Sequence, residues 1–169
     1  MVTRHPAIRL FASLALCLLA GYAELYLFLP TLTGWYGSLQ KPSFIPSVTV
    51  IYYGIIVLSL LMACSLYIIW NAAQTSKDAR LAVWLVIFAL ILSAGWFFAF
   101  FWVKSVFFSM VVVAILLTVL AAIIYQSLRS AVLAVLFTIP YFIVMLFVTY
   151  ANVLIYLMNP NLPLIGFVL

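Results

Sequence analysis

The chain has 169 residues, of which 70% are hydrophobic and only 5% are charged. A soluble domain carries about 25% charged residues, so this composition cannot cover a surface in water and predicts an integral membrane protein. The length fits one membrane domain over residues 1–169 and excludes a soluble module beside it. The net charge of +5 comes from basic residues that stand singly at the ends of apolar runs, which favours contacts with membrane lipid over nucleic acid.

Five apolar runs are each long enough to span a bilayer as a helix, which takes about 20 residues. The first occupies residues 10–29 and stops at Pro30. An alternative is a cleaved signal peptide with Gly21 and Ala23 before the cut, but the apolar run continues past that point and favours a mature helix. The others occupy residues 48–70, 81–103, 106–126 and 131–158, with a turn near Lys104. The predicted fold is an all-α bundle of five transmembrane helices.

The basic residues also predict the orientation of this multi-pass bundle. Lys41 and Lys104 fall on one side of the membrane in a five-span topology, and the other basic residues fall on the opposite side. The positive-inside rule then places the N-terminus in the cytoplasm and the C-terminus outside. The residues on the predicted cytoplasmic side are Arg4, Arg9, Lys77, Arg80 and Arg129.

The loop at residues 30–47, which we call the lid, is unlike a simple linker. It is too polar to span a bilayer, yet it is rich in aromatic residues and carries a single charge, Lys41. Pro42 and Pro46 prevent a regular helix across it, because each removes a backbone donor and disfavours helical geometry in the preceding residue. Irregular loops on a rigid scaffold often carry function, so we expect the lid to belong to the functional site.

Small and polar residues at helical spacing indicate which helix faces point into the bundle. The first, third and fifth spans carry such stripes, whereas the fourth is nearly all aliphatic and is expected to be the most lipid-exposed. Glu24 is the only acidic residue inside a span, and an acid within the membrane is a functional candidate. Its predicted polar partner is Lys41. The alternatives are that Glu24 reaches water at the nearby interface, or that it is protonated and bonded to a tyrosine.

Residues for common catalytic chemistry are scarce. The only histidine, His5, lies in the N-terminal tail, and Cys17 and Cys64 lie inside apolar runs without metal-ligand spacing. The sequence contains no glycine-rich phosphate loop. These features predict no catalytic residues, no metal site and no required cofactor, and they favour the binding of an apolar or amphipathic molecule.

Several segments, in order from about residue 20 to residue 159, resemble the TspO/MBR family, the translocator proteins also called tryptophan-rich sensory proteins. The lid is similar to the family's WYxxLxKPxFxPP segment. The second and third spans resemble its LYxxW and WxxxFF patterns, and the fifth resembles PYxxWxxFAxxLNxxIxxLN. The matching residues are Trp35, Tyr36, Leu39, Lys41, Pro42, Phe44, Pro46, Leu66, Tyr67, Trp70, Trp96, Phe100, Phe101, Pro140, Tyr141, Phe147, Asn152 and Asn159.

The resemblance implies a five-helix bundle, often a homodimer, with a pocket under the lid for a small amphipathic ligand. In the family this pocket is associated with porphyrins, sterols and benzodiazepine-type compounds, so a porphyrin or haem-type ligand and a transport or sensory role are expected. The ligand-binding residues that it implies here are Trp35, Lys41, Pro42, Phe44, Pro46, Ile55, Ser93, Trp96, Phe100, Tyr141 and Asn152.

The sequence departs from the family pattern at several of these positions. The second lid proline is Ser47, the third-span asparagine is Ser93, and the tryptophans of the second and fifth spans are Ile55 and Val144. In bacterial members those two tryptophans are linked to porphyrin breakdown, so an enzyme acting on a pigment is not expected. The alternative to ligand binding is a structural or regulatory protein that acts through dimer or partner contacts, with the pocket filled by its own side chains.

Overall fold

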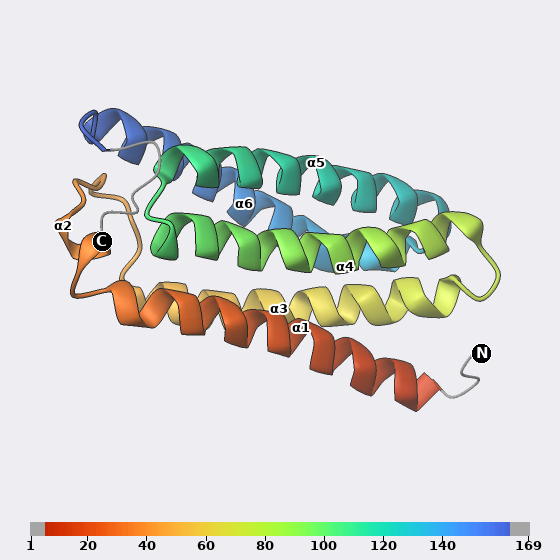
Figure 1. Cartoon of the computed structure of the whole chain (residues 1–169). Coiled ribbons are helices and arrows are strands. Elements are labelled where there is room, and N and C mark those ends of the chain that lie inside the picture. Colours follow the sequence, from red (N-terminus) through yellow and green to blue (C-terminus); the bar gives the residue numbers. More distant parts are fainter. Residues whose placement is uncertain (1–5, 163–169) are drawn as a thin grey trace.

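The computed structural model describes residues 6–162, and Figure 1 shows them as a bundle of long helices. Two short helical segments lie in or beside the lid, η1 (Leu29–Thr31) and α2 (Trp35–Ser38). Each long helix is long and apolar enough to cross a membrane, which confirms the predicted five-helix membrane fold. The long helices are α1 (Pro6–Phe28), α3 (Val48–Ala72), α4 (Lys77–Phe97), α5 (Val106–Ser130) and α6 (Val132–Met158).

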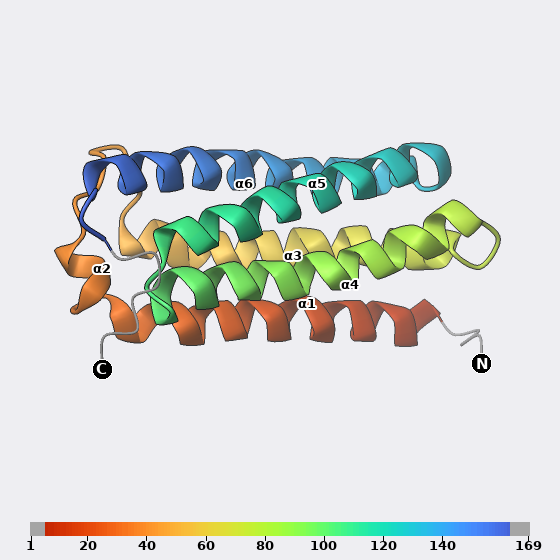
Figure 2. The same ribbon diagram turned by 45° about the horizontal axis from the view of Figure 1, so that its top comes forward.

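The five long helices pack side by side in a closed ring. α1 packs against α3, α3 against α6, α6 against α5, α5 against α4, and α4 returns to α1. Figures 1 and 2 show the lid and α2 at one end of this ring, the end at which α1 and α6 finish. α3 also packs against α4 across the ring, and the lid covers one end of the bundle (Figures 1 and 2).

Serine side chains set the starts of three of the long helices. The Oγ atoms of Ser47, Ser76 and Ser105 accept hydrogen bonds from the third backbone N–H that follows each, at 3.4, 3.3 and 3.1 Å. Such N-caps satisfy donors that a helix start leaves unpaired. The Ser76 cap makes α4 begin at Lys77, earlier than the predicted residue 81, so the polar segment before the third span forms its first turn.

The chain turns between α4 and α5 near Lys104, as predicted from the length of the apolar run. A π-helical segment, Phe98–Trp102, precedes the turn, and Lys104 adopts a left-handed conformation with φ of 56°. The wider π-helical turn changes the helical register, and Phe100 and Phe101 are both buried. This irregularity brings two adjacent aromatic rings into the interior beneath the lid.

The expectation that the fourth span is the most lipid-exposed is wrong. α5 packs between α4 and α6 and buries an aliphatic stripe, including Val113, Leu116 and Leu120. An aliphatic helix needs no polar partners, so it fits between two neighbours as readily as it faces lipid. In the described residues the span with the smallest buried share is the first one, which exposes Phe11 and Leu19.

Candidate functional site

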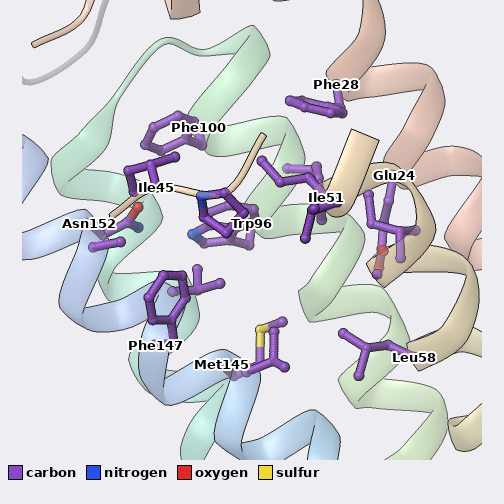
Figure 3. A pocket seen from close by; sticks show the side chains of 18 of the residues that line it. Glu24, Phe28, Ile45, Ile51, Leu58, Trp96, Phe100, Met145, Phe147 and Asn152 are labelled. Atoms are coloured by element: carbon purple, nitrogen blue, oxygen red, sulfur yellow. The ribbon is translucent and has the colours of Figure 1, made fainter. Parts of the chain in front are cut away.

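A cavity of about 440 Å³ lies beneath the lid, between α1, α3, α4 and α6 (Figure 3). Sites for small molecules are typically about 300–1,000 Å³, mostly apolar, with a few polar groups. This pocket has that character, because its wall is aliphatic and aromatic except at a few positions. Its polar side chains are Glu24, Tyr36, Trp96, Tyr141 and Asn152.

The pocket reaches the outer surface of the bundle between α3 and α6. Val50 and Val57 of α3 and Phe147 of α6 line it and are also exposed on the outside. Gly54 lies on the same side of the pocket, and a methyl group added there would meet no atom within 4 Å. In a membrane this opening faces the acyl chains, so an apolar molecule has a route into the pocket from the bilayer.

The predicted site residues fall into two groups. Trp35, Lys41, Pro42 and Phe44 belong to the lid without lining the cavity, and Ser93 lies behind the pocket wall. The predicted residues that line the cavity are Glu24, Pro46, Ile55, Trp96, Phe100, Tyr141 and Asn152.

Lys41 holds the lid together and does not face the pocket. Its ammonium donates to the backbone carbonyls of Tyr36 and Leu39 at 2.5 and 3.1 Å, and it lies 4.5 Å from the centre of the Tyr36 ring. The short helix α2 ends here and leaves carbonyl groups that a cation can satisfy. Burial raises the pKa of the Tyr36 phenol, so the ring beneath the ammonium is neutral at physiological pH.

Aromatic contacts attach the lid to the bundle on two sides. On one side the rings of Trp35 and Phe100 are 5.2 Å apart and those of Tyr36 and Phe101 are 5.5 Å apart. On the other side Phe44 packs 5.7 Å from the ring of Phe147 on α6. Edge-to-face pairs at these distances contribute about 0.5–1.5 kcal/mol beyond the burial of their area. Trp35 and Phe44 therefore position the lid over the pocket.

Asn159, just beyond the end of α6, fastens the middle of the lid. Its Oδ1 accepts from the Gln40 backbone N–H at 3.0 Å, and its Nδ2 donates to the Gln40 carbonyl at 2.9 Å. The same Nδ2 donates to the Ile155 carbonyl at 2.7 Å, which fixes the amide on the helix end. One side chain thereby ties the middle of the lid to the end of α6.

Replacing Asn159 with alanine is expected to loosen the lid. Two hydrogen bonds to Gln40 are lost, each worth about 0.5–1.5 kcal/mol, so the Gln40 amide should exchange its hydrogen at least about tenfold faster. Hydrogen exchange of the full chain in nanodiscs measures this. Asn161→Ala is the matched control, because no side-chain hydrogen bond involves Asn161 in the described residues. Equal exchange rates of the Gln40 amide in the two variants would show that Asn159 does not hold the lid.

Glu24 lies in a buried hydrogen-bonded group that joins three helices. Ser93 on α4 donates its hydroxyl proton to Glu24 Oε1 at 2.5 Å, and Ser93 Oγ is 2.6 Å from the Tyr141 hydroxyl on α6. Glu24 is only 6% exposed, so the interpretation that it reaches water is wrong. The predicted pairing with Lys41 is also wrong, since the ammonium is bound within the lid. A tyrosine does take part, but through Ser93.

Two further polar side chains stand on the pocket wall. Asn152, which is 2% exposed, donates from Nδ2 to Ser109 Oγ at 3.1 Å, a bond that ties α6 to α5. The Trp96 indole is buried, and its Nε1 donor has no hydrogen-bond partner within residues 6–162. Buried donors are normally satisfied, so this N–H is a group that a ligand acceptor can engage.

Much of the pocket wall consists of residues that the sequence did not single out. Ile45 of the lid, Ile51 and Leu58 of α3, and Val148 of α6 line the cavity. They are aliphatic residues in aliphatic surroundings, so no chemical feature distinguishes them from lipid-facing neighbours. The available signal is their helical spacing from marked residues. Val148, for example, lies two turns after Tyr141 and one turn before Asn152, on the same face of α6.

Five membrane-spanning helices around an apolar, small-molecule-sized pocket under an aromatic lid define a class of membrane protein with an internal cavity. The sequence profile of the TspO/MBR family matches residues 13–157, nearly the whole chain, and the chain belongs to this family. The family resemblance of its motifs is thereby confirmed. No curated protein matches the chain.

Proposed function

We propose that the protein binds a small amphipathic molecule, of the porphyrin, tetrapyrrole or sterol-like class, in the pocket beneath the lid. The observation that carries the proposal is the cavity of about 440 Å³, which the chain's own side chains do not fill. This favours ligand binding over the alternative of a purely structural protein. We further propose that binding serves a transport or sensory role in the membrane.

The character of the wall supports an aromatic or polycyclic ligand. Trp96 and Phe100 stack with ring centres 5.5 Å apart, and both line the cavity. Flat rings add favourable contacts to such a pair, and the aliphatic residues on α3 and α6 supply the opposite wall. The opening between α3 and α6 suits a molecule that partitions into the bilayer before it binds.

We propose binding without catalysis. Ile55 and Val144 stand where bacterial members of the family have the tryptophans that are linked to porphyrin breakdown, and both line the pocket here as aliphatic side chains. Neither offers a group that exchanges protons or electrons with a ligand. A bound porphyrin should therefore bleach in light no faster than the same porphyrin in protein-free nanodiscs, and faster bleaching would favour an enzyme.

We infer that the lid end of the bundle faces away from the cytoplasm. Lys41 and Lys104 are at that end, whereas Arg9, Lys77 and Arg129 are at the opposite end (Figure 1). The positive-inside rule favours the cytoplasm for the end richer in Lys and Arg. A ligand that enters under the lid then comes from the outer half of the bilayer.

A titration of protoporphyrin into the full chain in nanodiscs tests the binding proposal. The Soret absorption of the porphyrin should change saturably, and Trp96→Leu should weaken binding by at least about fivefold through loss of the stacked ring. Trp84→Leu is the matched control, because Trp84 is 69% exposed on the lipid-facing side of α4. Non-saturating partition, or equal effects of the two variants, would contradict the proposal.

A further inference from the structure

We propose that Glu24 makes the pocket selective for ligands that present a hydrogen-bond donor, above all a protonated amine, toward α1. The inference rests on the proposed function, since it names the head group that the pocket prefers. The group formed by Glu24, Ser93 and Tyr141 is called the acceptor site below. Figure 3 shows Glu24 at the edge of the pocket opposite Asn152.

The hydrogen-bond pattern leaves Glu24, which lines the pocket, with unused acceptor capacity. Ser93 has one proton and donates it to Glu24 Oε1, so the Tyr141 hydroxyl must donate to Ser93 Oγ. The Tyr141 proton then points to Ser93 Oγ, and the Ser93 proton points to Glu24. The other carboxyl oxygen, Oε2, has no hydrogen-bond partner in the part of the chain that the structure describes, and Glu24 lines the cavity.

The charges around the pocket also favour a ligand with a donor or a cation at Glu24. Among the residues 6–162 that line the cavity, Glu24 is the only one with an ionisable acidic or basic side chain other than tyrosine, and none of them is Lys or Arg. Lys41, the nearest basic residue in the lid, donates to two backbone carbonyls. A cation or donor bound beside a buried carboxyl group stabilises its ionised form, and a second carboxylate placed there makes ionisation of either group more costly.

Trp96 offers a second polar group on the pocket wall. The Trp96 Nε1 donor is unpartnered among residues 6–162, so it suits a carbonyl or other acceptor on the body of the ligand. The preferred ligand is therefore aromatic, with a basic nitrogen at Glu24 and an acceptor near Trp96. A carboxylate-bearing ligand, such as a porphyrin, is expected to direct its carboxylates away from the acceptor site.

A head-group series with one ring system tests this selectivity. The probes are anthracenylmethylamine, anthracenylmethanol and anthracenecarboxylic acid, titrated into the full chain in phosphatidylcholine nanodiscs, with protein-free nanodiscs subtracted. Energy transfer from tryptophan to anthracene reports binding. The amine should bind at least about tenfold more tightly than the carboxylate, with the alcohol between them, which corresponds to about 1.4 kcal/mol or more.

A test variant and a control variant show whether the preference for the amine depends on the acceptor site. Glu24→Gln should weaken amine binding by about tenfold or more and should change alcohol binding by less than about threefold. Asp78→Asn is the matched control, because it removes the chain's other acidic side chain, which pairs with Arg129 at 3.4 Å away from the pocket. It should leave the binding of all three probes unchanged.

The outcomes separate this inference from the proposed function. Saturable binding of all three probes with equal affinity, or equal weakening of every probe by Glu24→Gln, overturns the inference and leaves a ligand pocket in place. Absence of saturable binding for every probe overturns both. If Glu24→Gln fails to fold, the head-group series on the unaltered chain still decides, because the carboxylate binding as tightly as the amine contradicts the inference.

Discussion

Replacing Gly54 with tryptophan is expected to reduce protoporphyrin binding by about 100-fold, or about 2.8 kcal/mol of binding free energy. Gly54 lines the pocket on α3, and the space beside it is open, so an indole there occupies part of the cavity without displacing the backbone. A buried indole covers about 150–250 Å², which is space that the ligand would otherwise contact. The Soret titration in nanodiscs measures the change.

Leu60→Trp is the control for this experiment. Leu60 is on the same helix, is 42% exposed and does not line the pocket, so a tryptophan there adds the same ring to the lipid-facing surface. It should leave the affinity within about twofold of the unaltered chain. If the two tryptophan variants bind porphyrin equally well, the ligand does not bind in this cavity.

The second large effect is expected where α1 crosses α3. A Cβ atom added at Gly21 would overlap Ser59 Oγ, which donates to the Ile55 carbonyl at 2.8 Å within α3. Gly21→Ala should therefore destabilise the bundle by about 1–3 kcal/mol, as overpacking of a close contact does. Denaturant titration of the purified protein in mixed micelles, followed by circular dichroism, measures the free energy of unfolding.

Two further substitutions test whether the overlap with Ser59 causes the loss of stability in Gly21→Ala. Gly54→Ala adds the same methyl group where nothing lies within 4 Å, so it should not destabilise the protein. Ser59→Ala removes the overlapping Oγ and should recover at least half of the loss in the Gly21→Ala background. A loss of stability that Ser59→Ala does not reduce would show that the crossing of α1 and α3 is not the reason.

The five spans and the lid were predictable because their signals are strong. A run of about 20 apolar residues has few alternatives to a membrane helix, and Pro42 and Pro46 exclude a helix across the lid. The small and polar stripe of the first span predicted the inward face of α1. Its members are Ser13, Cys17, Ala20, Gly21 and Glu24, and all but the half-buried Ala20 are buried. The helix ends were less accurate, because a single capping serine such as Ser76 moves a start by several residues.

The partners of the charged residues were not predictable from the sequence. Lys41 and Glu24 lie on the same predicted side of the membrane and have opposite charge, which favours a pair. The lysine instead finds the carbonyls that α2 leaves at its end, and the acid finds the hydroxyl of Ser93. Such choices depend on distances of a few ångströms that spacing along the chain does not encode. Aliphatic wall residues such as Leu58 could not be predicted either, because the sequence does not distinguish them from lipid-facing aliphatic residues.

Native mass spectrometry of the full chain, released intact from the membrane, shows whether the pocket holds a small molecule. We expect a co-purified small molecule at one per chain in the unaltered protein, and its absence in Gly54→Trp, whose side chain occupies the cavity. The absorption spectrum of the sample then tells a tetrapyrrole from a colourless ligand. Chains that carry no small molecule and do not take up added protoporphyrin, or that bind it equally with Gly54→Trp, would contradict the account.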